Sequence, residues 1–414
     1  MFHVPQKASR RPYLLIGIAA AAILGGGFAA TRLSSDKPKA DEVERISAPA
    51  LMARPEVQVV ESLPQLKERL DDMAASRQFT GAVLVARGNE VLFRQTYGKA
   101  NYEQDTPFQL DTRFRLASVS KQFTGVAILK LQDQGKLSVN DPVCKWIQPC
   151  SDRWRDIKIH HLISHTSGIP DLMAQANWGY VRATYHSPEQ LIENASRYGL
   201  QFAPGTKVRY NNVGFNLAAD IVGKASGMPF EQYLQSEILG PLGLNDTGSD
   251  ADNNATGLAM GYGLFPAGLT PQPLANVSVV HGAGALYSTM DDLLMWNHAL
   301  HNGQVLKPES YRDLIRDHAP ANTPSERGRE HRLYGFGIFV NSLGDRVEPS
   351  FPETQIYHTG SWAGFRNLVT YEPSNKITVV VLSNNYHLRD QVFLISQQAM
   401  AEALGKPFPQ AMKR

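Results

Sequence analysis

The strand-forming segments of this chain are divided between its two ends, and this division constrains the fold more than any other feature. Residues 81–98 (GAVLVARGNEVLFRQTYG) predict two strands joined at 87–89, directly after an amphipathic helix over Pro64–Arg77. The next strand patterns come near the C-terminus, at Tyr334–Val340, Leu368–Tyr371 and Lys376–Leu382. We therefore expect an α+β fold in which the early hairpin and the late strands share one antiparallel sheet.

The middle of the chain has helical patterns, with apolar residues at helical spacing between Gly, Pro and Asn turns. The predicted helices are Ser120–Gln134, Ile157–Ser164, Pro188–Arg197, Val213–Ser226, Phe230–Leu239 and Met290–Leu300, and Leu394–Leu404 closes the chain. These patterns predict a mostly helical subdomain inserted into a sheet that is flanked by the N- and C-terminal helices.

The first thirty residues predict an export signal. Residues 13–30 are uncharged and apolar, follow the basic residues of 1–12, and are long enough to cross a bilayer. They are either a signal anchor with a cytoplasmic basic tail or a signal peptide, since Gly27-Phe28-Ala29 offers a small-x-small cleavage site. Polar, proline-containing residues 31–60 predict a flexible linker, and 61–408 the folded domain, on the periplasmic or extracellular side.

The composition narrows the possible partners and cofactors. Lys plus Arg total 41 against 39 for Asp plus Glu, so charge gives no reason to expect a nucleic-acid partner. Cys144 and Cys150 are the only cysteines, and in an oxidising compartment we favour a disulfide between them over two free thiols. His161 and His165 have zinc-ligand spacing but lack the intervening Glu, so no metal site is expected.

The chemistry-bearing stretch is at 114–123, where Ser118 and Lys121 stand three apart as a helical pattern begins. Residues three apart share a helix face, so the lysine can contact the serine hydroxyl, and burial can lower its pKa enough to accept a proton. Two further motifs follow, at 210–212 (Tyr-Asn-Asn) and 358–360 (His-Thr-Gly). The chain has no G-x-S-x-G elbow and no phosphate-binding glycine loop, so no cofactor is expected.

In this order and spacing, the three motifs resemble those of the β-lactamase-related serine hydrolases, in the branch with Tyr-x-Asn second and His-Thr-Gly or Lys-Thr-Gly third. That branch includes class C β-lactamases, D-alanyl-D-alanine carboxypeptidases, D-aminopeptidases and esterases. The resemblance covers about residues 65–405 and extends to two further segments, His161–Gly168 and Gly282–Thr289.

The resemblance implies a role for each motif residue. Ser118 is the nucleophile that becomes acylated, Lys121 takes or relays its proton, and Tyr210 assists proton transfer to the leaving group. Which group is the general base remains open. Asn212 orients the lysine and binds a substrate carbonyl. The strand bearing His358, Thr359, Gly360 and Ser361 lies along the substrate, and the N–H groups of Ser118 and Ser361 form an oxyanion hole.

The third motif bears on the substrate, because a lysine at its first position would supply a fixed charge for a carboxylate. His358 is expected to hold that charge only partly near neutral pH. Within the resembled branch, His-Thr-Gly is typical of carboxypeptidases, aminopeptidases and esterases. We therefore expect a D-amino-acid peptidase or an esterase acting on a small or peptidoglycan-like substrate, ahead of a β-lactamase. A catalytically silent penicillin-binding-like receptor or scaffold is the alternative of another class.

Overall fold

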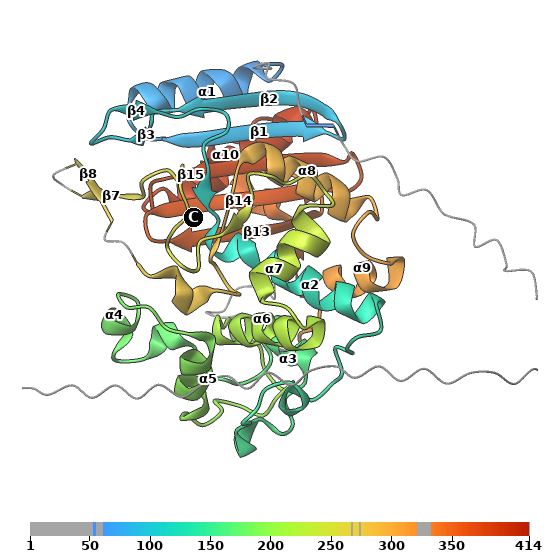
Figure 1. Cartoon of the computed structure of the whole chain (residues 1–414). Helices are drawn as coiled ribbons and strands as arrows, with labels where there is room; N and C mark the ends of the chain where they lie inside the picture. The colour runs from blue at the N-terminus through green and yellow to red at the C-terminus, as the bar shows by residue number, and fades with distance from the viewer. Residues whose placement is uncertain (1–52, 55–60, 266–267, 273–274, 321–332, 414) are drawn as a thin grey trace, which may run out of the picture. The chain divides into compact units, whose positions relative to one another are not determined.

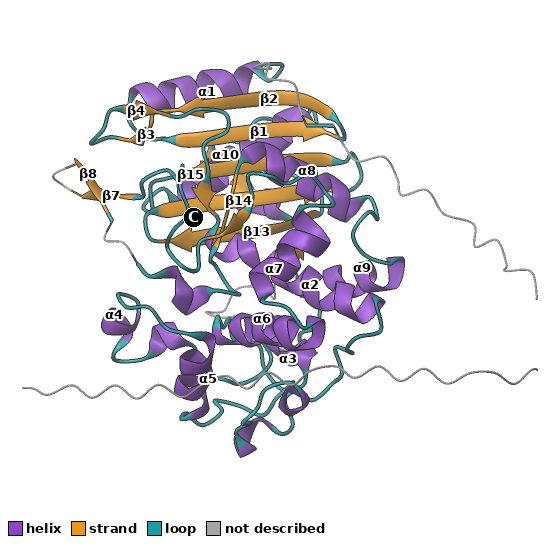
Figure 2. Cartoon of the chain, viewed as in Figure 1, coloured by secondary structure: helices purple, strands orange, loops and turns teal. Residues whose placement is uncertain are grey.

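A seven-stranded antiparallel sheet joins strands from residues 81–97 with strands from residues 333–383 (Figures 1 and 2). The computed structural model describes residues 53–54, 61–265, 268–272, 275–320 and 333–413. The strand order is β10-β11-β13-β14-β15-β1-β2. These strands are β1 (Gly81–Arg87), β2 (Glu90–Tyr97), β10 (Leu333–Tyr334), β11 (Phe339–Asn341), β13 (Gln355–Trp362), β14 (Phe365–Glu372) and β15 (Ile377–Ser383). Strand β1 pairs with β15 from Gly81 opposite Ser383 to Arg87 opposite Ile377, which confirms the predicted pairing of early and late strands.

Both faces of this sheet are covered by helices, so β1 is apolar along nearly its whole length. Val83 and Val85 pack into one core with α1 (Pro64–Ala75) and α10 (Arg389–Ala403). Leu84 and its β1 neighbours on the same face pack into the other core, with α2 (Lys121–Asp133) and α8 (Met290–His301). The terminal helices therefore cover one face, as predicted, and the inserted helices cover the other.

The first and last helices are also joined by a polar contact. Pro64 opens α1, where its missing N–H costs no hydrogen bond. The next two backbone N–H groups, of Gln65 and Leu66, donate to the Glu402 carboxylate of α10 at 2.9 and 2.8 Å. A negative charge at a helix N-terminus satisfies otherwise unpaired donors and opposes the helix dipole, so this contact stabilises both the start of α1 and its packing on α10.

The segments between β2 and β10 form the helical subdomain, in which α6 packs against α2 and α3. Its remaining helices are α3 (Ile159–Ile163), α4 (Trp178–Val181), α5 (Pro188–Ser196), α6 (Val213–Ser226), α7 (Phe230–Leu234) and α9 (Pro308–Ile315). Short strands are β3 (Lys99–Asn101), β4 (Thr106–Pro107), β5 (Phe114–Arg115), β6 (Gly248–Ser249), β7 (Tyr262–Phe265), β8 (Gly268–Pro271), β9 (Leu286–Ser288), β12 (Val347–Glu348) and β16 (Ala411–Met412). Cys144 and Cys150 form a disulfide in the loop after α2.

Several predicted boundaries differ from the structure, among them that of the last helix, which begins at Arg389 and not at Leu394, and two predicted elements differ in kind. The predicted strand Tyr334–Val340 is two short strands, β10 and β11, which meet at a glycine-containing turn. Gly337 has φ +85°, and a Cβ there would lie 2.4 Å from the carbonyl oxygen of Lys121. The predicted helix Phe230–Leu239 is α7 followed by a π-helical turn over Gln235–Leu239. Gly337 lies against Lys121, which is more than two hundred positions earlier in the chain, so the local sequence pattern does not predict the turn between β10 and β11.

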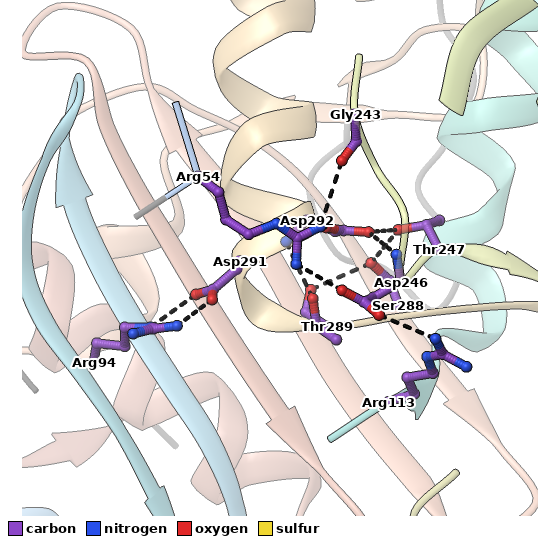
Figure 3. Close-up of polar contacts among 10 residues, drawn as sticks. All are labelled: Arg54, Arg94, Arg113, Gly243, Asp246, Thr247, Ser288, Thr289, Asp291 and Asp292. Carbon is purple, nitrogen blue, oxygen red and sulfur yellow. Dashed lines mark hydrogen bonds and ion pairs between the residues drawn. The ribbon is translucent and has the colours of Figure 1, made fainter. Parts of the chain in front are cut away.

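A polar network anchors the chain before α1 to the folded domain (Figure 3). Arg54, which falls within the predicted linker, contacts Asp246 at 2.6 Å and Asp292 at 2.8 Å. The Asp292 carboxylate is buried and also accepts the Thr247 hydroxyl and the Asp246 N–H, both at 2.8 Å. Next to it on α8, Asp291 pairs with Arg94 of β2. The chain therefore contacts the domain before residue 61.

The predicted export segment at 13–30 lies outside the described residues. Among the residues that the structure does describe, no helix has the length and apolar character needed to cross a bilayer.

Candidate active site

Ser118 lies on a sharp turn between a strand and a helix. Strand β5 ends at Arg115, one 3₁₀ turn covers Ala117–Ser120, and α2 begins at Lys121. Residues three apart are nearly eclipsed in a 3₁₀ turn, so the two side chains project to the same side. The Lys121 Nζ atom lies 3.1 Å from the Ser118 Oγ atom. The predicted nucleophile and its partner are therefore in hydrogen-bond contact.

The turn is fixed by its neighbours in the sheet. Ala117 has φ +52°, a left-handed conformation that is uncommon outside glycine. The Asn367 amide of β14 donates to the carbonyls of Arg115 and Leu116 at 3.0 and 3.3 Å. A Cβ on Gly360 would lie 2.1 Å from the Leu116 carbonyl oxygen, so the glycine of the third motif lets β13 run directly against the nucleophile turn.

Lys121 is fully buried, and this burial sets its charge. Its Nζ contacts Asn212 Oδ1 at 2.8 Å and the Ala283 carbonyl at 2.9 Å, in addition to Ser118. Desolvation lowers the pKa of Lys121 to about 7, while the charge of Asp171 acts in the opposite direction. A large share of Lys121 is therefore neutral near pH 7 and can accept a proton from the serine.

Asp171 holds Asn212 in the orientation that Lys121 needs, and sequence reasoning missed it. The backbone N–H and the Nδ2 amide of Asn212 both donate to the Asp171 carboxylate, each at 3.1 Å. With its NH₂ group committed to the carboxylate, Asn212 must turn Oδ1 toward Lys121. Burial raises the pKa of Asp171, and the contacts to Asn212 oppose that rise. The only signal in the sequence is its place three residues after the His161–Gly168 segment.

Tyr210 approaches the same pair from the irregular loop before α6. The centre of its ring is 4.9 Å from Lys121 Nζ, and Ser118 is near enough to its hydroxyl to affect the pKa of the phenol. Burial raises the pKa of Tyr210 above its ordinary value, and the Ser118 contact lowers it by less. The phenol therefore stays protonated at neutral pH and can act as a donor or relay. The second motif thus contributes Tyr210 and Asn212 to two sides of the lysine.

His358 is not the partly charged group that the sequence suggested. Its side chain is 1% exposed, its Nδ1 atom is 2.7 Å from the Thr359 carbonyl, and its Nε2 atom is 3.3 Å from the Tyr334 hydroxyl. Burial, with a smaller effect from Lys121, lowers the pKa of His358 to about 3. The imidazole is therefore uncharged near pH 7. Its burial depends on Tyr334 of β10, a contact that the sequence around His358 does not predict.

A small pocket opens beside the nucleophile. It is lined by Ala117, Ser118, Met173, Asn212, Val280, Ala283, Gly284, Ser361 and Trp362. The segment over Gly282–Thr289 supplies one wall and is tied to α2 by the Thr124 hydroxyl, which donates to the Gly282 carbonyl at 2.6 Å. Trp362 meets Trp178 of α4 with ring centres 5.7 Å apart. Within the described residues, the lining includes no charged side chain, and the His358 side chain is not part of it.

The serine on the turn before α2 can therefore lose its proton to a buried, partly neutral lysine, which is the chemistry of a serine hydrolase. A model of the Beta-lactamase family matches residues 66–401, and the chain belongs to this family. The match covers the sheet, the helical subdomain and all three motifs, which confirms the resemblance, the fold class and the enzyme class expected from the sequence.

Several curated relatives are similar along most of the chain. Penicillin-binding protein 4* of Bacillus subtilis is 26% identical over 361 residues, which span 83% of this chain and 76% of the relative. The D-alanyl-D-alanine-carboxypeptidase/endopeptidase AmpH of Escherichia coli is 31% identical over 245 residues, 56% of this chain and 62% of AmpH. Esterase EstB of Burkholderia gladioli is 28% identical over 335 residues, 71% of this chain and 83% of EstB.

Solved structures give the same result for the fold. The octameric penicillin-binding protein homologue from Pyrococcus abyssi superposes with a TM-score of 0.69 at 27% identity, over 83% of this chain and 77% of that one. The D-amino acid amidase from Ochrobactrum anthropi, complexed with D-phenylalanine, has a TM-score of 0.71 at 20% identity, over 83% of this chain and 99% of the amidase. At that identity the amidase shows a shared fold alone.

Proposed function

We propose that this protein hydrolyses an ester or a D-aminoacyl amide through an acyl-enzyme on Ser118, with Lys121 as the general base. The observation that carries the proposal is the contact of a fully buried lysine with the serine hydroxyl at 3.1 Å. An exposed lysine in the same place would hold its proton and could not activate the serine. A protein that only binds its ligand reversibly would have no use for such an amine, so the contact favours a protein whose serine becomes acylated.

The proton path follows from the contacts of these groups. Neutral Lys121 takes the Ser118 proton while Oγ attacks the substrate carbonyl carbon, giving a tetrahedral oxyanion and a protonated lysine. That proton passes through the Tyr210 hydroxyl to the leaving oxygen or nitrogen, and the bond from the carbonyl carbon to that atom breaks. Water then attacks the acyl-enzyme and gives a proton to the same lysine. The lysine returns this proton to Ser118 Oγ as the bond from the acyl carbon to Oγ breaks, which releases the acid and restores neutral Lys121.

The oxyanion would be held by the backbone N–H groups of Ser118 and Ser361. Both residues border the pocket, and β13 lies against the nucleophile turn because Gly360 permits close approach. Such donors act most strongly on the charge that develops in the transition state. Asn212 also borders the pocket and can offer its amide to a substrate carbonyl, although most of its hydrogen-bonding capacity is committed to Asp171 and Lys121.

The described residues that border the pocket beside Ser118 supply no cation for a substrate carboxylate, which favours substrates that lack one. Its described lining is uncharged, and His358 is neutral and turned toward Tyr334. Arg366, opposite Ser361 in the sheet, directs its guanidinium to Tyr386. The relatives include both an esterase and a carboxypeptidase. The uncharged lining favours ester hydrolysis over removal of a C-terminal amino acid, whose carboxylate it would not pair with. We rank esters and D-aminoacyl amides above D-alanyl-D-alanine peptides, and β-lactams last.

A matched substrate panel tests this ranking. Purified protein is assayed with a p-nitrophenyl ester, a D-aminoacyl p-nitroanilide, a peptide ending in D-alanyl-D-alanine, and the β-lactam nitrocefin, beside Ser118→Ala. We expect kcat/KM for the ester or the anilide, neither of which carries a carboxylate, to exceed that for nitrocefin by at least about tenfold, and every activity to vanish in the variant. Nitrocefin as the best substrate would identify a β-lactamase. Penicillin binding without turnover of any substrate would identify a receptor.

We further propose that the catalytic domain acts outside the cytoplasm. The apolar segment at 13–30 and the Cys144–Cys150 disulfide support this position, because disulfides persist in oxidising compartments. Cell fractionation and the intact mass of the mature protein decide between a retained anchor and a cleaved signal peptide. Recovery of the full-length protein in the cytosol with both cysteines reduced would contradict the proposal.

A further inference from the structure

The loop that carries Tyr210 needs support from elsewhere, because residues 201–212 form no helix or strand. That support comes from the His161–Gly168 segment, to which the proton path above gives no role. Its carbonyl groups accept backbone N–H groups along the whole loop: Gly168 from Gln201 at 2.8 Å, Thr166 from Gly205 at 2.8 Å, and His165 from Arg209 at 2.9 Å. The His161–Gly168 segment therefore holds the loop in place by backbone hydrogen bonds, and the last of these bonds is to Arg209, next to Tyr210.

His165 contacts both neighbours of Tyr210. Its carbonyl accepts the Arg209 N–H at 2.9 Å, and its Nδ1 atom accepts the Asn211 N–H at 3.1 Å. The imidazole also lies against the tyrosine, with ring centres 4.3 Å apart. We propose that His165 is a positioning residue that fixes the Tyr210 hydroxyl at the Ser118–Lys121 pair.

This role needs a neutral imidazole, since only an unprotonated Nδ1 can accept the Asn211 N–H. His165 is 2% exposed, and its other ring neighbours are Tyr334 and Phe215, at 4.5 and 5.2 Å between ring centres. Burial lowers the pKa of His165 well below its ordinary value, and the nearby Lys121 acts in the same direction. A protonated His165 would also place a second positive charge near Lys121 and so destabilise the protonated lysine that forms during acylation.

The backbone of His165 suggests which substitution separates positioning from folding. Its φ is +62°, a left-handed conformation that asparagine and glycine adopt at lower cost than most residues. Asparagine keeps a side-chain acceptor where Nδ1 lies, whereas glycine keeps only the conformational freedom. Comparing His165→Asn with His165→Gly therefore isolates the acceptor from backbone strain.

The role of His165 depends on the proposed function of Tyr210, so the experiment measures both. Acylation kcat and KM are determined for the full chain, His165→Asn, His165→Gly, Tyr210→Phe and the double variant His165→Gly/Tyr210→Phe, each checked for folding by its Tm. A tyrosine hydroxyl displaced by about 1 Å should cost kcat about 10²-fold. We expect that loss in His165→Gly with KM nearly unchanged, and a kcat within about fivefold of wild type in His165→Asn.

The double variant gives the decisive outcome, because two residues that act through one hydroxyl have non-additive effects. The double variant should be no slower than Tyr210→Phe alone. A full additional loss would overturn the positioning role, as would wild-type kcat in His165→Gly. If Tyr210→Phe itself retains wild-type kcat, the proposed role of Tyr210 fails instead, and the single His165 variants still report whether the histidine matters.

Discussion

The charge state of Lys121 controls the rate in this account, and the pH dependence of acylation tests it. Burial brings its pKa to about 7, so about half of the lysine is neutral at pH 7. At the ordinary lysine pKa of about 10.5, only about 1 in 3,000 would be neutral at that pH. The acylation rate should therefore rise about tenfold per pH unit below pH 7 and level off above it.

Lys121→Arg is the matching perturbation, because arginine keeps the positive charge but does not release its proton. Loss of a positioned base should slow acylation by about 10²–10⁴-fold and remove the rise near pH 7. The assay is stopped-flow acylation by a fluorogenic ester from about pH 5 to about pH 9, with Lys130→Arg on the same helix as a control expected to behave as wild type. A wild-type rise centred above about pH 9, or a Lys121→Arg rate within about tenfold of wild type, would refute the reasoning.

Further predictions concern the groups around this pair. Asp171→Asn removes a charge that raises the pKa of Lys121, so the rise in the pH–rate profile should move to lower pH; an unmoved profile would show that the lysine does not feel this carboxylate. Gly360→Ala places a Cβ 2.1 Å from the Leu116 carbonyl oxygen. Strand β13 must then withdraw by about 1 Å, and kcat/KM should fall about 10²-fold. Unchanged kinetics would show that the strand is not held against the nucleophile turn. Burial opposes protonation of His281, but the Asp220 carboxylate, 3.1 Å away, outweighs burial and raises the pKa of His281. The folded state therefore holds this proton more tightly than the unfolded state. The resulting stabilisation is present below the unfolded pKa of about 6.5 and is lost as pH rises through the folded pKa. Thermal unfolding should therefore show that His281→Asn lowers Tm more near pH 6 than near pH 9, and an equal loss at both would contradict it.

Features that depend on local pattern were predictable from the sequence. Helix α6 begins and ends at the predicted residues, Val213 and Ser226, because an apolar helical pattern is followed by Gly227, which ends the helix with φ +80°. That the early hairpin and the late strands share one antiparallel sheet was predictable from their strand patterns, and in that sheet β1 pairs with β15. The contact of Ser118 with Lys121 was predictable from their spacing and confirmed at 3.1 Å.

Features that depend on distant contacts were not predictable. Asp171 is a single acidic residue in a loop, and only the folded chain brings it to Asn212. The charge of His358 could not be read from its motif, because its neutrality comes from burial beneath Tyr334. The same holds for Gly337, whose need for a glycine comes from the carbonyl of Lys121. In each case the deciding partner is at least 24 positions away along the chain, as with Tyr334 and His358.

The central claim is that Ser118 carries the acyl group, and mass mapping of a covalent adduct tests it most directly. Wild-type protein and Ser118→Ala are incubated with a fluorophosphonate, weighed intact, digested and sequenced by fragmentation, with Tm measured to show that both are folded. The account predicts one adduct per chain, on Ser118 and not on the buried Ser120 beside it, and no adduct in the variant. An adduct on another serine, or labelling that persists in Ser118→Ala, would contradict it.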